Sequence, residues 1–172
     1  MVRLGLILAL AVLPAINLHA AETDDLKITT DKVIGVTHFL ESHPLDPAAP
    51  GLRALMADWE DKATEVVDYV CPKVLDPVPS DAAAHSPELL VQFIFGSAAY
   101  QLANPANKGA LVPSQLAGIR SMLKAYQGFV ASDPKSRIAR LDDLLQMEAA
   151  GSLDAYLTPI ILESCKGPFE HG

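Results

Sequence analysis

The sequence predicts an all-α fold, a compact single-domain bundle of five to six helices around a central apolar helix. No stretch alternates apolar and polar residues with Val, Ile and Thr between turn signals, as exposed strands do. Apolar residues instead recur with a helical period, and Asp-Pro or Asn-Pro pairs beginning at residues 46, 76, 104 and 133 divide the periodic segments. Because a residue before proline avoids the helical region, these pairs indicate helix boundaries.

The first predicted helix begins with Thr30 as its N-cap and runs to about Ser42. Its expected buried residues are Val33, Ile34, Val36, Thr37 and Leu40. The second predicted helix, from about Gly51 to Cys71, follows the i, i+3, i+4, i+7 rule most clearly. Its apolar positions are Leu52, Leu55, Met56, Trp59, Ala63, Val66, Val67 and Val70. Its acidic residues Asp58, Asp61, Glu65 and Asp68 fall on the opposite side, which predicts a solvated face.

The third predicted helix, about residues 87–103, is apolar on every side. Ser86 is the expected N-cap, Pro87 suits the first turn, and Glu88 complements the helix dipole. Its length of about 25 Å is short of the ~30 Å hydrocarbon core of a bilayer, and polar residues interrupt it. We therefore expect it at the centre of the bundle, with Phe93 and Phe95 both buried.

Two further helices and a C-terminal element complete the prediction. A fourth helix is expected from about Pro113 to Ala131, with Leu116, Ile119, Leu123, Tyr126 and Val130 buried. The fifth is capped by Asp133 and ends at Gly151, a typical left-handed C-terminal residue. Its buried residues are Ile138, Leu141, Leu144 and Leu145.

The last predicted element spans Ser152 to Lys166 and contains Pro159. Proline either kinks this helix or starts a second short one. Between the second and third helices, residues 72–86 form a Pro-, Asp- and Ala-rich crossover. Loops of this length in compact domains are often functional or mobile.

Residues 1–20 are typical of a secretory signal peptide. Arg3 gives a basic start, Leu4 to Leu13 are apolar apart from Gly5, and small residues follow around Ala20. The apolar run is too short to span a bilayer. We therefore expect export to the periplasm or the exterior, with residues 21–172 as one helical domain and no stable membrane anchor after cleavage.

The charge balance excludes some partners. Residues 21–172 carry 12 Lys and Arg against 21 Asp and Glu, a formal charge of −9. Nucleic acid is a poor partner at this balance, because phosphate binding depends on cationic side chains. Anionic lipid surfaces would also repel the protein.

Cys71 and Cys165 are the only cysteines. In an oxidising compartment two cysteines most simply pair, so the sequence predicts a disulfide bond between them. Two unpaired buried thiols are the alternative. The absence of a Cys-x-x-Cys pair disfavours a redox enzyme.

Candidate metal ligands are His38, Glu41 and His43, which lie close together in HFLESH. A zinc-protease helix needs histidines at i and i+4 with Glu beside the first, and this segment does not match. His85 and His171 would have to complete any site in space. We therefore expect solvated or hydrogen-bonded histidines, and no metal or other cofactor.

Other catalytic patterns are equally incomplete. The acidic face of the second helix is expected to stay ionised in water, and it lacks calcium-loop spacing. Ser97 lacks the Gly-x-Ser-x-Gly turn of a nucleophile. No Gly-rich phosphate loop occurs. Trp59, Tyr100 and Tyr126 lie on apolar faces, which favours core packing over ligand platforms.

Three hypotheses follow. The leading one is a non-enzymatic exported helical protein that binds a partner protein or a small apolar ligand. The first alternative is an extracytoplasmic hydrolase, metal-dependent or carboxylate-based, that uses His38, Glu41 and His43. The second alternative is a tetratricopeptide-like scaffold, suggested only by Tyr126 lying eight residues before Pro134.

Overall fold

The computed structural model describes residues 28–81, 83–165 and 167. Within these ranges every regular element is a helix, which confirms the predicted all-α fold. The elements are α1 (Thr30–Ser42), α2 (Ala49–Glu60), α3 (Pro72–Leu75), α4 (Ser86–Ala103), η1 (Pro105–Asn107), α5 (Leu111–Ser132), η2 (Pro134–Ser136), α6 (Ala139–Ala149) and α7 (Leu153–Ser164). The predicted signal peptide, residues 1–20, lies outside the described residues.

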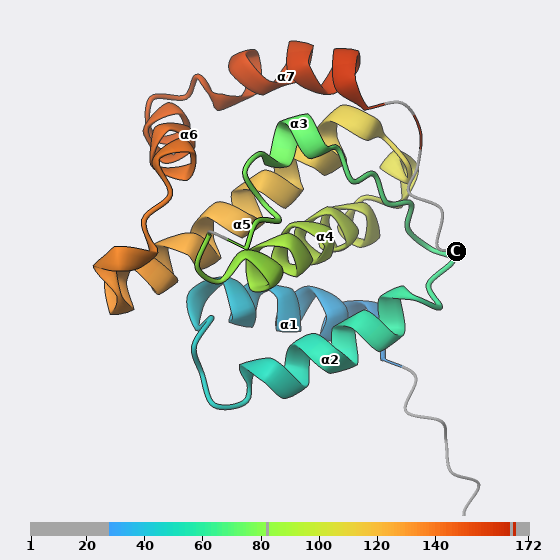
Figure 1. Ribbon diagram of the computed structural model, residues 1–172. Helices are drawn as coiled ribbons and strands as arrows, with labels where there is room; N and C mark the ends of the chain where they lie inside the picture. Colours follow the sequence, from blue (N-terminus) through green and yellow to red (C-terminus); the bar gives the residue numbers. More distant parts are fainter. Residues whose placement is uncertain (1–27, 82, 166, 168–172) are drawn as a thin grey trace, which may run out of the picture.

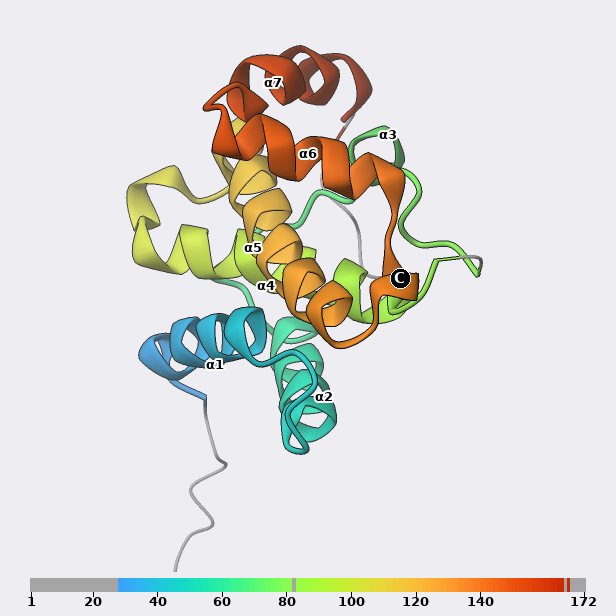
Figure 2. The same ribbon diagram turned by 90° about the vertical axis from the view of Figure 1, so that its left-hand side faces the viewer.

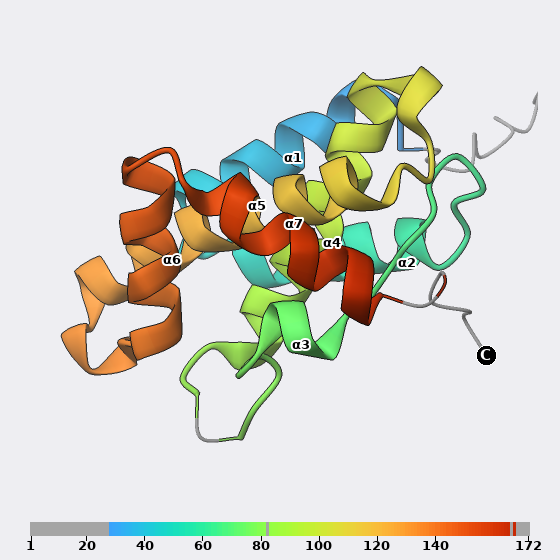
Figure 3. The same cartoon turned by 90° about the horizontal axis from the view of Figure 1, so that it is seen from above.

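Helices α4 and α5 form the centre of the bundle and make its most extensive helix–helix contact. The α1–α2 hairpin covers one side of this pair, and α3 and α7 lie on the other side (Figure 1). Seen from above, α7 runs over α5 (Figure 3), and α6 packs against both of these helices (Figure 2). Among the described helices, none combines the length and apolarity needed to cross a membrane.

Helix α4 is apolar on every side because it separates two cores. Phe93 points into the larger core, which α3, α5, α6 and α7 complete. Phe95, two residues later, points into a smaller core against α1 and α2. Both phenylalanines are 1% exposed, as expected for the central helix. Two opposite faces of α4 are therefore buried, whereas an amphipathic helix that packs on a single core buries only one face.

The α4–α5 crossing is close because a glycine on each helix lies directly against the other helix. A Cβ on Gly96 would lie 2.2 Å from the Ser121 Cβ, and a Cβ on Gly118 would lie 2.7 Å from the Phe93 ring. Gln92 crosses the same junction, since its Nε2 donates to the Ser121 Oγ at 2.9 Å. The glycines thus have the packing role that offsets their low helix propensity.

The second helix was predicted to run to about Cys71, but the observed helix α2 ends at Glu60. Residues 61–71 form turns and then a segment without regular structure, in which Val66 and Asp68 are both buried. The segment is rich in β-branched residues, which lowers its helix propensity. Gln101 replaces the missing helical hydrogen bonds: its Oε1 accepts from the Val67 N–H and its Nε2 donates to the Val67 carbonyl, both at 3.0 Å.

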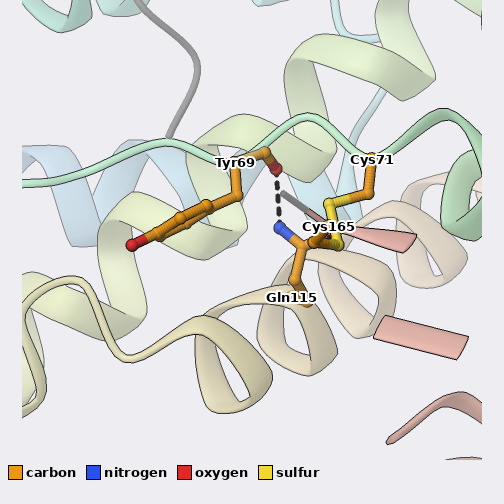
Figure 4. The surroundings of a disulfide bond; sticks show 4 residues. All are labelled: Tyr69, Cys71, Gln115 and Cys165. Carbon is orange, nitrogen blue, oxygen red and sulfur yellow. Dashed lines mark hydrogen bonds between the residues drawn. A yellow bond between two sulfur atoms is a disulfide. The ribbon is translucent and has the colours of Figure 1, made fainter. Parts of the chain in front are cut away.

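The predicted Cys71–Cys165 disulfide is confirmed. It joins the end of this non-helical segment to the C-cap of α7, across a sequence separation of 94, with the Cα atoms 5.3 Å apart (Figure 4). Beside it, the Gln115 Nε2 donates to the Tyr69 carbonyl at 2.6 Å (Figure 4). The bond and the amide together hold residues 69–71 against α5 and α7.

Several predicted helix ends shift. The N-cap of α1 is Thr29 instead of Thr30, and its hydroxyl accepts from the Lys32 N–H. Ser86 is the first residue of α4 and not its cap; its hydroxyl accepts from the Ser80 N–H at 2.7 Å and so closes the preceding loop. Asp133 does cap a helix, but the short helix η2 and not the long one, which begins only at Ala139.

The remaining predictions concern proline and glycine. Pro159 lies inside an unbroken α7, so no second helix starts there. Gly151 follows α6 with φ +69°, as a left-handed C-terminal residue should. The 72–86 crossover contains α3, whose Val74 and Leu75 are fully buried, so its first part belongs to the larger core.

Candidate functional site

The candidate metal ligands do not form a ligand set. Glu41 is nearly buried, and its Oε2 accepts from the Lys124 Nζ at 2.8 Å. His43 caps the C-terminus of α1 and stacks on Phe39 at 5.0 Å between ring centroids. His38 is exposed. In the described part of the chain, no three His, Cys, Asp or Glu side chains lie close enough together to hold a metal ion.

The other two histidines do not complete a site with them. His85 precedes α4 with φ 57° and stacks on Phe129, 4.1 Å between centroids. His171 lies outside the described residues.

His38 and Glu41 share a shallow cleft of about 250 Å³ between α1, α4 and α5, whose cations are Arg120 and Lys124. Partial burial acts to lower the pKa of Arg120, but hydrogen bonds and charge from Glu148 and Asp154 outweigh it and raise that pKa. Lys124 is paired with Glu41. Both cations are therefore already neutralised within the fold, which leaves them poorly suited to bind an anionic substrate.

The acidic face predicted on the second helix is only partly correct. Asp58 pairs with Lys62 at 2.7 Å and, like Asp61 and Glu65, is exposed. Asp68 is 7% exposed because the chain has left the helix before reaching it. The four carboxylates consequently do not share one solvated face.

Ser97 and the aromatic residues have structural roles. Ser97 is 2% exposed in the middle of α4, with its hydroxyl 3.4 Å from the Gln101 Nε2. The Tyr126 hydroxyl accepts from the Ile138 N–H at 2.8 Å and donates to the Asp142 Oδ1 at 2.9 Å. Tyr126 thus fixes the chain that leads into α6.

Trp59 and Tyr100 are half-buried. Trp59 packs on the smaller core, and the Tyr100 hydroxyl accepts from the Asn107 Nδ2 at 2.9 Å. The core-packing prediction therefore holds for Trp59 and Tyr126, whereas Tyr100 lines the cleft that also contains His38 and Glu41.

The strongest candidate site is an apolar groove between α1 and α2, which we call the α1–α2 groove. It has a volume of about 310 Å³ and is lined almost wholly by apolar atoms. Its lining residues are Ile28, Lys32, Gly35, Val36 and Leu55. Leu55 is 45% exposed, although the sequence pattern assigns it to the buried stripe of its helix. A concave apolar surface with one cationic edge is typical of ligand and peptide sites.

Gly35 lines this groove at an open position of α1. It lies mid-helix in α1, where glycine costs about 1 kcal/mol relative to alanine. A Cβ on Gly96, Gly118 or Gly128 would overlap a neighbouring residue, but a Cβ on Gly35 would meet nothing within 4 Å. The helical Gly51 is equally open but does not line the groove, so what sets Gly35 apart is its place in the groove lining.

Sequence reasoning missed this site because the helical pattern assigned Val36 and Leu55 to the core without regard to Gly35. A mid-helix glycine between apolar neighbours was the available signal, and it is informative only when its surroundings are known. Comparison with protein-family models, curated proteins and solved structures gave no match to this chain.

Proposed function

We propose that this chain is an exported, non-enzymatic binding protein that holds an apolar segment of a partner, or an apolar ligand, in the α1–α2 groove. The observation that carries the proposal is the open space over Gly35 beside the half-exposed Leu55. An empty apolar groove leaves hydrophobic surface in water, and covering it contributes about 25 cal/mol for each Å² removed from water.

Two observations support export. The Cys71–Cys165 bond is of a kind that persists in oxidising compartments. The predicted signal peptide at residues 1–20 would direct the chain there.

Binding is testable with the neutral fluorescent probe N-phenyl-1-naphthylamine and the purified disulfide-bonded protein. We expect saturable enhancement of its fluorescence that Gly35→Leu weakens at least fivefold, because the new side chain occupies the groove. Gly51→Leu is the matched control: Gly51 is also helical and open, but it does not line the groove. Equal binding by the wild type and both variants would overturn the proposal.

The hydrolase and helical-repeat alternatives stay predictions. For the hydrolase, the relevant observation is that Glu41 already pairs with Lys124 and His43 with Phe39. Elemental analysis of protein purified without chelators would revive this alternative if it found stoichiometric metal.

A further inference from the structure

One positive charge stands at the edge of the α1–α2 groove, between two helices that lie side by side (Figure 1). Lys32 is the only charged residue among the described residues that line the groove, and the others are apolar or glycine. Lys32, Gly35 and Val36 follow at i, i+3 and i+4, so they share one face of α1. The lysine therefore stands one helical turn from the apolar part of the lining.

Within the described part of the chain, the ammonium of Lys32 has no acidic partner. The ion pairs formed there include that of Lys124 with Glu41, but none of them includes Lys32. Asp31 precedes Lys32, but successive helical residues point about 100° apart, and Asp31 does not line the groove. The Lys32 ammonium can therefore pair with an anionic group of a bound molecule.

The size of the groove limits its occupant. Its volume of about 310 Å³ is at the lower end of the range of about 300–1,000 Å³ that is typical of small-molecule sites. This volume favours a single short hydrocarbon chain over a two-chain lipid. Leu55 is 45% exposed, so a chain bound against it removes apolar surface from water. The molecule complementary to this groove is therefore a short apolar chain with one anionic end.

On the basis of the proposed function, we infer that the ligand of the α1–α2 groove is a small amphiphilic monocarboxylate of the medium-chain fatty acid class. Its chain covers Ile28, Val36 and Leu55 and passes over the open Gly35. Its carboxylate accepts from the ammonium of Lys32, a compact point charge that suits a single anionic group. The formal net charge of −8 repels an anion at long range, so the affinity comes from contact within the groove.

The test measures displacement of N-phenyl-1-naphthylamine from the disulfide-bonded protein by compounds below their micelle-forming concentrations. Decanoate, 1-decanol and decylammonium share one chain and differ in the charge of the head group. Hexanoate, octanoate and decanoate share the carboxylate and differ in chain length. The dipeptide acetyl-Leu-Leu, with a free carboxylate, tests the carboxyl terminus of a partner protein as the other source of the same chemistry.

We expect decanoate to bind about tenfold more tightly than decylammonium, and each methylene to tighten carboxylate binding up to about fourfold. Lys32→Gln should weaken decanoate about threefold to fivefold, the upper range for an exposed ion pair, and leave decanol unchanged. Lys135→Gln is the matched control, because Lys135 is also exposed but does not line the groove. Gly35→Leu should weaken both compounds. Circular dichroism verifies that each variant folds.

The remaining outcomes separate this inference from the proposed function. If Lys32→Gln weakens decanoate no more than decanol, or decylammonium binds as tightly as decanoate, recognition of a carboxylate is refuted, while sensitivity to Gly35→Leu would still support the groove as a binding site. Affinity that does not rise with chain length, or acetyl-Leu-Leu binding as tightly as decanoate, would refute the fatty acid class. If the dye does not bind, or Gly35→Leu changes no binding, the inference and the proposed function both fail.

Discussion

Replacing Gly96 with alanine tests the close crossing of α4 and α5. The added Cβ would lie 2.2 Å from the Ser121 Cβ, 1.2 Å short of the 3.4 Å at which ordinary contact begins. It would also lie 2.7 Å from the Ser121 Oγ, which accepts the Gln92 hydrogen bond. The two helices must therefore move apart or the serine must move, and either change disturbs the most extensive helix–helix contact of the bundle.

The expected magnitude follows from three contributions. Overpacking costs about 1–3 kcal/mol, and loss of the Gln92–Ser121 hydrogen bond costs about 1 kcal/mol. The better helix propensity of alanine returns about 1 kcal/mol. Gly96→Ala should thus lower the free energy of unfolding by about 2 kcal/mol and Tm by about 4–8 °C. Gly35→Ala, with nothing within 4 Å of its new Cβ, should raise stability by up to ~1 kcal/mol.

Urea denaturation and calorimetry of the two single variants measure these values. Adding Ser121→Gly to Gly96→Ala removes the opposing Cβ, so the pair should show a coupling energy of about 1 kcal/mol or more. A Gly96→Ala protein as stable as the wild type would refute the close crossing. A destabilised Gly35→Ala protein would refute the open space over α1.

Four further predictions concern separate features. Reduction of the Cys71 disulfide should lower Tm by several degrees, since its loop is worth about 4–5 kcal/mol at most; equal scans with and without reductant would contradict this. Gln101→Leu should cost about 2–3 kcal/mol in urea denaturation, because the Val67 peptide group and the Gly109 N–H lose their partners, whereas the exposed control Gln146→Leu should cost under ~0.5 kcal/mol. Burial raises the pKa of Tyr126 above that of an unfolded tyrosine, so its contribution to stability is complete below pH ~10 and is lost as the pH rises through the pKa of the folded state. The difference between the absorbance titrations of the wild type and Tyr126→Phe should show a tyrosine that ionises above the pH at which an unfolded tyrosine does. A difference curve centred at the pKa of an unfolded tyrosine would contradict this. The predicted signal peptide should be removed on export, so the mature protein should have the mass of a chain that starts near Ala21. A mass that includes residues 1–20 would contradict cleavage.

Much of the fold could be predicted because local signals and packing agree in most elements. Helix α4 is the clearest case: its length, its proline in the first turn and its uniform apolarity placed it at the centre, and Phe93 and Phe95 are indeed buried. The Cys71–Cys165 bond could be predicted from the presence of two cysteines together with the predicted export. Neither inference required knowledge of a distant contact.

The failures share a cause, which is the influence of residues distant in sequence. Residues 61–71 have an apolar pattern that a helix would satisfy, but Gln101, which is 34 positions from Val67, provides hydrogen bonds to the backbone of a non-helical chain. The exposure of Leu55 could not be predicted for the same reason, because the period of a helix shows which residues share a face but not how much of that face is covered. The α1–α2 groove exists because part of the apolar face of these helices is not covered by another element.

The position of the disulfide has a consequence for how the molecule comes apart. The covalent ring that it closes runs from residue 71 to residue 165, and it contains α3 to α7 but neither α1 nor α2. The first two helices are attached to this ring only through the peptide chain and through non-covalent packing on α4 and α5. Amide hydrogens in the hairpin should therefore exchange through local detachment while those of the ring stay protected. The α1–α2 hairpin, which we propose binds a partner or a ligand, is therefore the part of the fold that can detach locally. The disulfide-closed ring is the more stable part on which the hairpin packs.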